Sequence, residues 1–94
     1  MTGRETENAL LTRCALVARG TKETARDQRE ANVFRVAAMV LQSHFPAEAT
    51  ALMQSSETYF QDHPAERLPA ADVVRRGWIF SLPRLRDMLS LWFQ

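Results

Sequence analysis

Residues 33–60 read VFRVAAMVLQSHFPAEATALMQSSETYF and contain two apolar stripes at helical spacing, one on each side of Phe45-Pro46. The stripes consist of Val33, Val36, Ala37, Val40, Leu41 and His44, and of Ala49, Leu52, Met53, Ser56 and Phe60. Proline disfavours a helical conformation in the residue before it and suits the first turn of a new helix. The stretch therefore predicts one helix that ends near Ser43 and a second over about residues 46–61. Because the connection is short, we expect these helices to pack as antiparallel neighbours.

A further helix is predicted N-terminal to this pair, over about residues 4–19. Thr2 and Glu5 have the capping-box spacing, in which each side chain satisfies a free backbone N–H of the other residue. Apolar residues then recur every three or four positions, and Gly20 is a suitable C-cap because glycine adopts the left-handed conformation without penalty. The members of this stripe are Leu10, Leu11, Cys14, Ala15, Val17 and Ala18.

The charged segment between these helices has two interpretations. In the first, Thr21 caps a long helix that continues to about Ser43 and whose first half faces solvent. Glu23 with Arg26, and Arg26 with Glu30, would then pair across one helical turn. In the second, residues 20–28 form a charged loop. The sequence does not choose between them.

The C-terminal third predicts two more helices. Residues 63–69 contain two prolines and indicate a connection. A helix over about residues 69–79 would present Ala71, Val74 and Trp78 to the core. Ser81 can cap a last helix with Pro83 in its first turn. The stripe of that helix is Leu82, Leu85, Met88, Leu89 and Trp92. The sequence thus predicts one all-α domain over residues 1–94, a small bundle of four to five helices.

Composition excludes several classes of protein. Cys14 is the single cysteine among 94 residues, so an internal disulfide and a cysteine-rich zinc site are impossible. A lone thiol in a domain of this size fits a reducing compartment. No segment approaches the ~20 consecutive apolar residues that span a membrane. We therefore expect a soluble cytoplasmic protein with no membrane association.

No motif predicts catalysis or a cofactor. Cys14 lies within an apolar stripe, where an inert buried thiol is the common outcome. His44, Glu48 and His63 lack a metal-ligand spacing, and Pro46 separates the first two. A phosphate-binding glycine loop, a GxSxG elbow and a dinucleotide fingerprint are all missing from the sequence. The expectation is a non-enzymatic protein with no metal and no cofactor.

The charges are segregated along the chain although the net charge is only +1. Residues 36–66 hold no Lys or Arg and four acids, Glu48, Glu57, Asp62 and Glu66, whereas both flanking segments carry an excess of basic residues. Such segregation can be satisfied within one fold, between two copies, or by a partner.

The C-terminal segment carries the sharpest functional pattern. Four of the eight aromatic residues lie in the last seventeen positions: Trp78, Phe80, Trp92 and Phe93. Aromatic, methionine and arginine side chains are enriched at association surfaces. We therefore expect an adaptor, inhibitor or regulatory subunit that docks on another protein or forms a homodimer. The expected contact residues are Leu85, Met88, Trp92 and Phe93, with Arg84 and Arg86 at the rim.

A small DNA-binding regulator is the alternative. Residues 70–89 can be read as a helix-turn-helix in which Arg75, Arg76, Arg84 and Arg86 contact nucleic acid. However, Trp78-Ile79-Phe80 lengthens the turn beyond the usual three or four residues, and Pro83 follows it. The low net charge also gives little general attraction to phosphates. Protein binding is therefore the favoured function.

Overall fold

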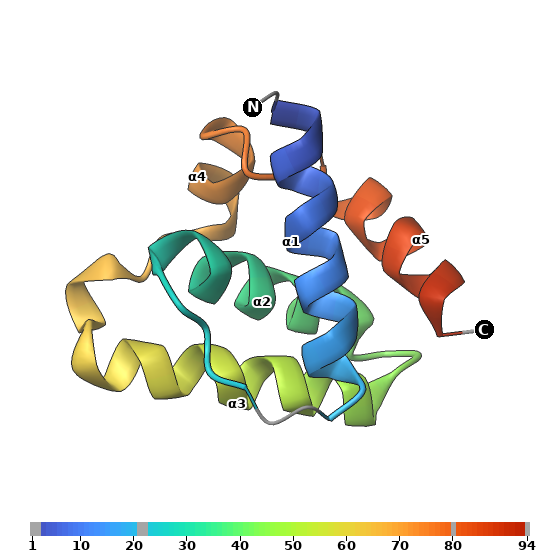
Figure 1. Cartoon of the computed structure of the whole chain (residues 1–94), viewed down its shortest axis with the longest axis horizontal. Helices are drawn as coiled ribbons and strands as arrows, with labels where there is room; N and C mark the ends of the chain where they lie inside the picture. The colour runs from blue at the N-terminus through green and yellow to red at the C-terminus, as the bar shows by residue number, and fades with distance from the viewer. Residues whose placement is uncertain (1–2, 21–22, 80, 94) are drawn as a thin grey trace.

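The computed structural model describes residues 3–20, 23–79 and 81–93, with side chains from residue 9 onward. Within these residues the chain forms α-helices and one 3-10 turn, η1, and no strand, so the predicted all-α fold is confirmed (Figure 1). The elements are α1 (Gly3–Ala18), α2 (Gln28–Leu41), α3 (Pro46–Asp62), η1 (Pro64–Glu66), α4 (Ala70–Arg75) and α5 (Leu82–Trp92).

The helices α2 and α3 form the centre of the fold and run in opposite directions, as predicted (Figure 1). Pro46 occupies the first turn of α3, where its missing N–H would have no helical partner in any case. The two predicted stripes supply much of one core. Its fully buried members from these helices include Val33, Phe34, Val36, Ala37, Leu41, Leu52 and Ser56.

The helices α1 and α5 complete the bundle. Leu10, Cys14 and Val17 of α1 and Leu85 and Leu89 of α5 are buried in the same core. The bounds of α1 agree with the predicted helix, and Gly20 has the left-handed φ of +92° expected of a C-cap. The capping residue predicted for this helix, Thr2, lies outside the described residues.

The start of the second helix differs from the first interpretation. Residues 23–26 are not helical, so the loop alternative is correct for this part of the segment, and α2 begins only at Gln28. Asp27 is the N-cap, and its side chain accepts a hydrogen bond from the N–H of Glu30 at 2.9 Å. The predicted cap, Thr21, lies outside the described residues. Arg26 and Glu30 do form an ion pair, but from loop to helix rather than along one helix.

The fourth helix is shorter than predicted and presents a different side. It ends at Arg75, because Gly77 adopts a left-handed φ of +74° that a helix cannot continue through. Val73 is the fully buried residue of α4. Of the three predicted core residues, Val74 and Trp78 are partly buried and pack against the core, whereas Ala71 is exposed. Within the described residues, none of the helices is both long and apolar enough to cross a membrane.

Candidate interaction surface

The last turns of α5 expose large apolar side chains. Ser81 caps the helix by accepting a hydrogen bond from the N–H of Arg84, as the sequence predicted. One side of α5 then packs on α2 and buries Leu85 and Leu89. In the last turn, Leu91, on the opposite side of the helix, is 70% exposed, and Trp92, at the end of the buried stripe, is 46% exposed. Burying either side chain would remove much apolar area from water.

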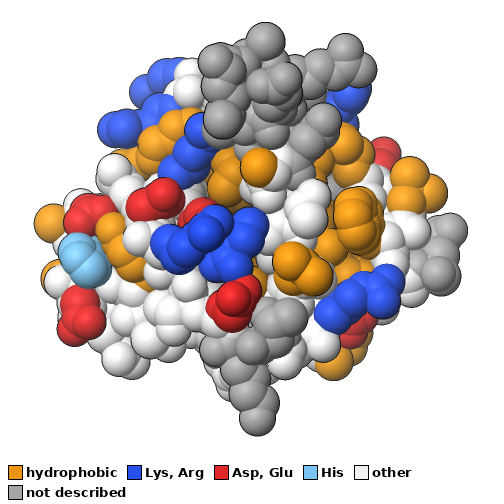
Figure 2. Space-filling model, viewed as in Figure 1, with side chains coloured by type: hydrophobic (Ala, Val, Ile, Leu, Met, Phe, Trp, Pro, Cys, Tyr) orange, Lys and Arg blue, Asp and Glu red, His pale blue; other side chains and the backbone are white. Residues whose placement is uncertain are grey.

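The end of α1 continues this apolar area. Arg19 donates a hydrogen bond to the carbonyl of Trp92, and its guanidinium lies 5.9 Å from the centroid of the Phe93 ring. Leu16 precedes Arg19 by one helical turn, so it lies on the same side of α1, and it is 45% exposed. Figure 2 shows hydrophobic side chains exposed on the face that α1 and α5 share. We call Leu16, Met88, Leu91, Trp92 and Phe93 the α5 surface.

An open groove adjoins the α5 surface. It has a volume of about 620 Å³ and lies where the ends of α1 and α5 meet the start of α3. Its lining is Ala18, Arg19, Gly20, Ala47, Glu48, Ala51 and Phe93. Most of these side chains are small, and the two that carry charge have opposite signs. Phe93 is held in place by a ring contact with Phe45, with the ring centroids 5.3 Å apart. We call this hollow the terminal groove.

The predicted contact residues do not all lie on this surface. Trp92, Met88 and Phe93 do, but Leu85 is only 3% exposed and belongs to the core, which corrects its assignment as a contact residue. Arg84 and Arg86 are exposed near the start of α5, and Arg86 pairs with the adjacent Asp87 at 3.3 Å.

Sequence reasoning missed four residues of this region: Leu16, Arg19, Glu48 and Leu91. Leu91 was missed because it falls outside the stripe that defines the core side of α5. The other three come from α1 and α3 and reach this region only through the packing of those helices.

The arginines of the DNA-binding alternative are placed apart. Arg75 pairs with Asp72 at 3.2 Å, and Arg76 lies over the Trp78 ring, 5.4 Å from its centroid. The helices α4 and α5 both pack on α2 and lie on opposite sides of α1 in Figure 1. A helix-turn-helix needs two helices packed on each other across a short turn. The geometry therefore gives this alternative no support, and it stays an untested prediction.

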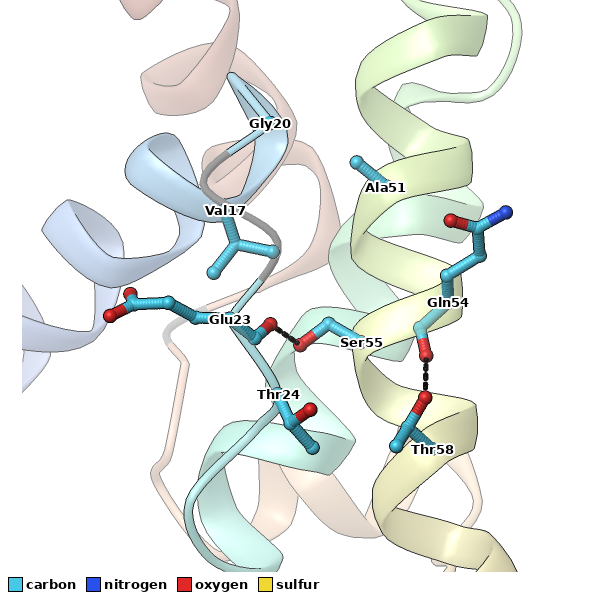
Figure 3. A pocket seen from close by; sticks show the side chains of 8 residues that line it. All are labelled: Val17, Gly20, Glu23, Thr24, Ala51, Gln54, Ser55 and Thr58. Carbon is cyan, nitrogen blue, oxygen red and sulfur yellow. Dashed lines mark hydrogen bonds between the residues drawn. The ribbon is translucent and has the colours of Figure 1, made fainter.

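A second hollow, of about 360 Å³, lies between the end of α1, residues 23–24 and the middle of α3 (Figure 3). Two of its three hydroxyl groups donate to the backbone. Ser55 Oγ donates to the carbonyl of Glu23 at 2.7 Å, and Thr58 Oγ1 donates to that of Gln54 at 2.9 Å. The Glu23 carboxylate pairs with Arg13. Three polar side chains of this hollow therefore already have partners within the chain.

The histidines that might have formed a metal site lie apart from other ligands. His44 is exposed after α2, and His63 stacks on Tyr59 with the ring centroids 4.3 Å apart. In the described part of the chain, no three His, Cys, Asp or Glu side chains are close enough together to hold a metal ion.

Cys14 is fully buried, and we expect it to react slowly. Burial raises the pKa of its thiol above the ordinary range, and the nearby carboxylate of Glu30 raises it further, so little nucleophilic thiolate forms. A thiol reagent should label the native protein at least about a hundredfold more slowly than the protein in denaturant, because reaction requires local opening. Rapid stoichiometric labelling without denaturant would show that this part of α1 opens freely.

Comparison with models of known protein families, with curated proteins and with solved structures found no significant match.

Proposed function

We propose that this chain is a protein-interaction module without a catalytic site, an adaptor, inhibitor or regulatory subunit that docks through its α5 surface. One observation carries the proposal: two consecutive large apolar residues, Leu91 and Trp92, are exposed in the last turn of a helix that buries Leu85 and Leu89. A protein of this size gains stability when such residues enter the core or an interface. Large exposed apolar patches are typical of binding sites.

The polar groups around the α5 surface support the same function. Arg19 donates to the Trp92 carbonyl and Phe93 packs on Phe45, so the end of α5 is tied to the rest of the fold before any partner binds. Preorganisation of this kind reduces the entropy lost on binding. Arg84 and Arg86 lie on the same helix and are solvent-exposed, as suits a polar rim around an apolar centre.

Site-specific photo-crosslinking tests this proposal. A benzophenone amino acid would replace Leu91 in one variant and Met39, which is 50% exposed on α2, in a matched control. After irradiation in the native host, position 91 should yield one dominant protein adduct and position 39 should not. The mass of the adduct identifies the partner. Equal labelling at both positions, or no adduct at position 91, would contradict a docking role for the α5 surface.

Trp92→Ala should remove that adduct while leaving the chain folded. Because Trp92 is only partly buried, we expect a loss of about 1–2 kcal/mol in the free energy of unfolding, below the ~3–5 kcal/mol of a fully buried tryptophan. Affinity for the partner should fall by roughly a hundredfold, because a central aromatic is lost from the interface. A thermal melt and a binding titration check the two parts. If the variant unfolds, Trp92 is a core residue.

A further inference from the structure

The terminal groove and the exposed end of α5 are next to each other on the surface. Phe93 lines the groove, and the residues just before it, Leu91 and Trp92, are exposed beside the groove rather than in it. The groove has a volume of about 620 Å³ and is open to solvent rather than enclosed. Ala18, Ala47 and Ala51 leave room for a large side chain from another molecule. One patch therefore carries both a protruding apolar group and a hollow that can receive one.

The two charges on the groove walls have opposite signs, so they can pair across a two-fold axis. Arg19, at the end of α1, and Glu48, in the first turn of α3, both line the groove. They do not form an ion pair within the chain, and within the described residues the carboxylate of Glu48 has no ion-pair partner. In a symmetric dimer the same patch is used twice, so a contact between residue i and residue j occurs in both directions. Arg19 and Glu48 are complementary in that arrangement.

We infer that a second copy of this chain binds the terminal groove. Across a two-fold axis, Leu91 and Trp92 of each copy enter the groove of the other, and Arg19 of each faces the partner's Glu48. The inference rests on the proposed function, because it names the partner of the same α5 surface. An isologous contact is closed, so the assembly stops at two copies.

Charge reversal followed by mixing tests the inference. Arg19→Glu and Glu48→Arg each place like charges opposite one another twice in a homodimer. Each variant should weaken dimerisation by about tenfold or more. In a heterodimer of the two variants, the introduced carboxylate at position 19 faces the introduced guanidinium at position 48. At the second contact, the retained Arg19 of one chain faces the retained Glu48 of the other.

Because opposite charges then meet at both contacts, the mixture should regain most of the lost affinity as a heterodimer, although the Arg19→Glu chain still lacks the hydrogen bond to the Trp92 carbonyl. Asp62→Arg, the same charge change as Glu48→Arg at the far end of α3, is the control and should leave dimerisation unchanged.

Sedimentation equilibrium from low to high micromolar concentration measures all four proteins and the mixture, and a thermal melt confirms that each variant is folded. Restoration by mixing can arise only between chains, so it supports the two-fold contact. Two results would overturn the assignment of the dimer contact to the terminal groove. One is that either single variant dimerises like wild type, and the other is that the mixture stays monomeric. A wild type that stays monomeric at high micromolar concentration would overturn the second copy as partner. The photo-crosslinked adduct at position 91 would then still decide whether the α5 surface binds another protein.

Discussion

Glu30→Ala should lower the free energy of unfolding by about 2–4 kcal/mol, because the largely buried Arg13 keeps only Glu23 as its ion-pair partner and the N–H of Arg26 loses its acceptor. Glu30 is only 4% exposed. Its two carboxylate oxygens accept hydrogen bonds from Nε and Nη2 of Arg13, both at 3.2 Å, from the guanidinium of Arg26 at 2.8 Å, and from the N–H of Arg26 at 3.0 Å. This residue joins α1, the loop before α2 and α2 itself. Its loss should destabilise all three.

A matched control separates burial from charge. Glu57 pairs with one arginine, Arg67, at 2.7 Å, and the two side chains of this pair are 40% and 45% exposed. Exposed ion pairs contribute about 0–1 kcal/mol, so Glu57→Ala should have a small effect. Chemical denaturation of both variants measures the difference. Similar losses at the two positions would show that burial of Glu30 does not determine its contribution.

The carboxylate of Glu30 should also make the free energy of unfolding depend on pH. Burial alone would raise the pKa of Glu30, but hydrogen bonds from Arg26 and Arg13 outweigh burial and hold the pKa below its ordinary value of 4.5. A lowered pKa in the folded state adds stability that is complete above the unfolded pKa and is lost as the pH falls through the folded one. The stability difference between wild type and Glu30→Gln should therefore narrow below about pH 4.5. Denaturation curves between neutral pH and pH 2 measure it.

Local rules were enough to predict the helices whose ends are marked by single residues. Pro46 and Ser81 fix the starts of α3 and α5, and Gly20 follows the end of α1. Each of these residues acts on the backbone within one helical turn, so neighbouring sequence contains the necessary information.

The start of α2 depends on contacts that are distant in sequence. The spacing of Arg26 and Glu30 suggested a pair along one helix. Instead, the buried carboxylate of Glu30 accepts hydrogen bonds from Arg13 of α1 and from Arg26 of the loop before α2. Asp27 and Glu30 have the same capping-box spacing as Thr2 and Glu5. This spacing is the sequence feature that could have placed the start of α2 correctly.

The candidate surface was predicted only in part for a similar reason. Periodicity groups Leu85 with Met88 and Trp92, because all three lie on one stripe of α5. Packing against α2 buries the first and leaves the last partly exposed. Leu91 lies off the stripe and is more exposed than any of them. Which end of the stripe is covered depends on how far the neighbouring helix extends. The spacing of residues within α5 carries no information about that.

Asn32→Ala should lower the free energy of unfolding by about 2–4 kcal/mol, because the fully buried amide of Asn32 holds the connection between α3 and α4 against α2. Its Nδ2 donates to the carbonyls of Gln28 and Glu66, both at 2.9 Å, and its Oδ1 accepts from the N–H of Leu68 at 2.8 Å. Alanine leaves the N–H of Leu68 without this acceptor.

Amide hydrogen exchange distinguishes loss of these bonds from a general loss of packing. In Asn32→Ala, exchange at the N–H of Leu68 should accelerate more than exchange in the middle of α3, because the connection then opens without global unfolding. Gln28→Ala is the control, since it removes a single 3.2 Å bond to the carbonyl of Glu66 and leaves the Leu68 N–H paired. Gln28→Ala should lower the free energy of unfolding by only about 1 kcal/mol. Uniform acceleration in both variants would mean that Asn32 contributes to the core as a whole. Acceleration confined to residues near Leu68 would show that this amide determines the position of the segment leading into α4.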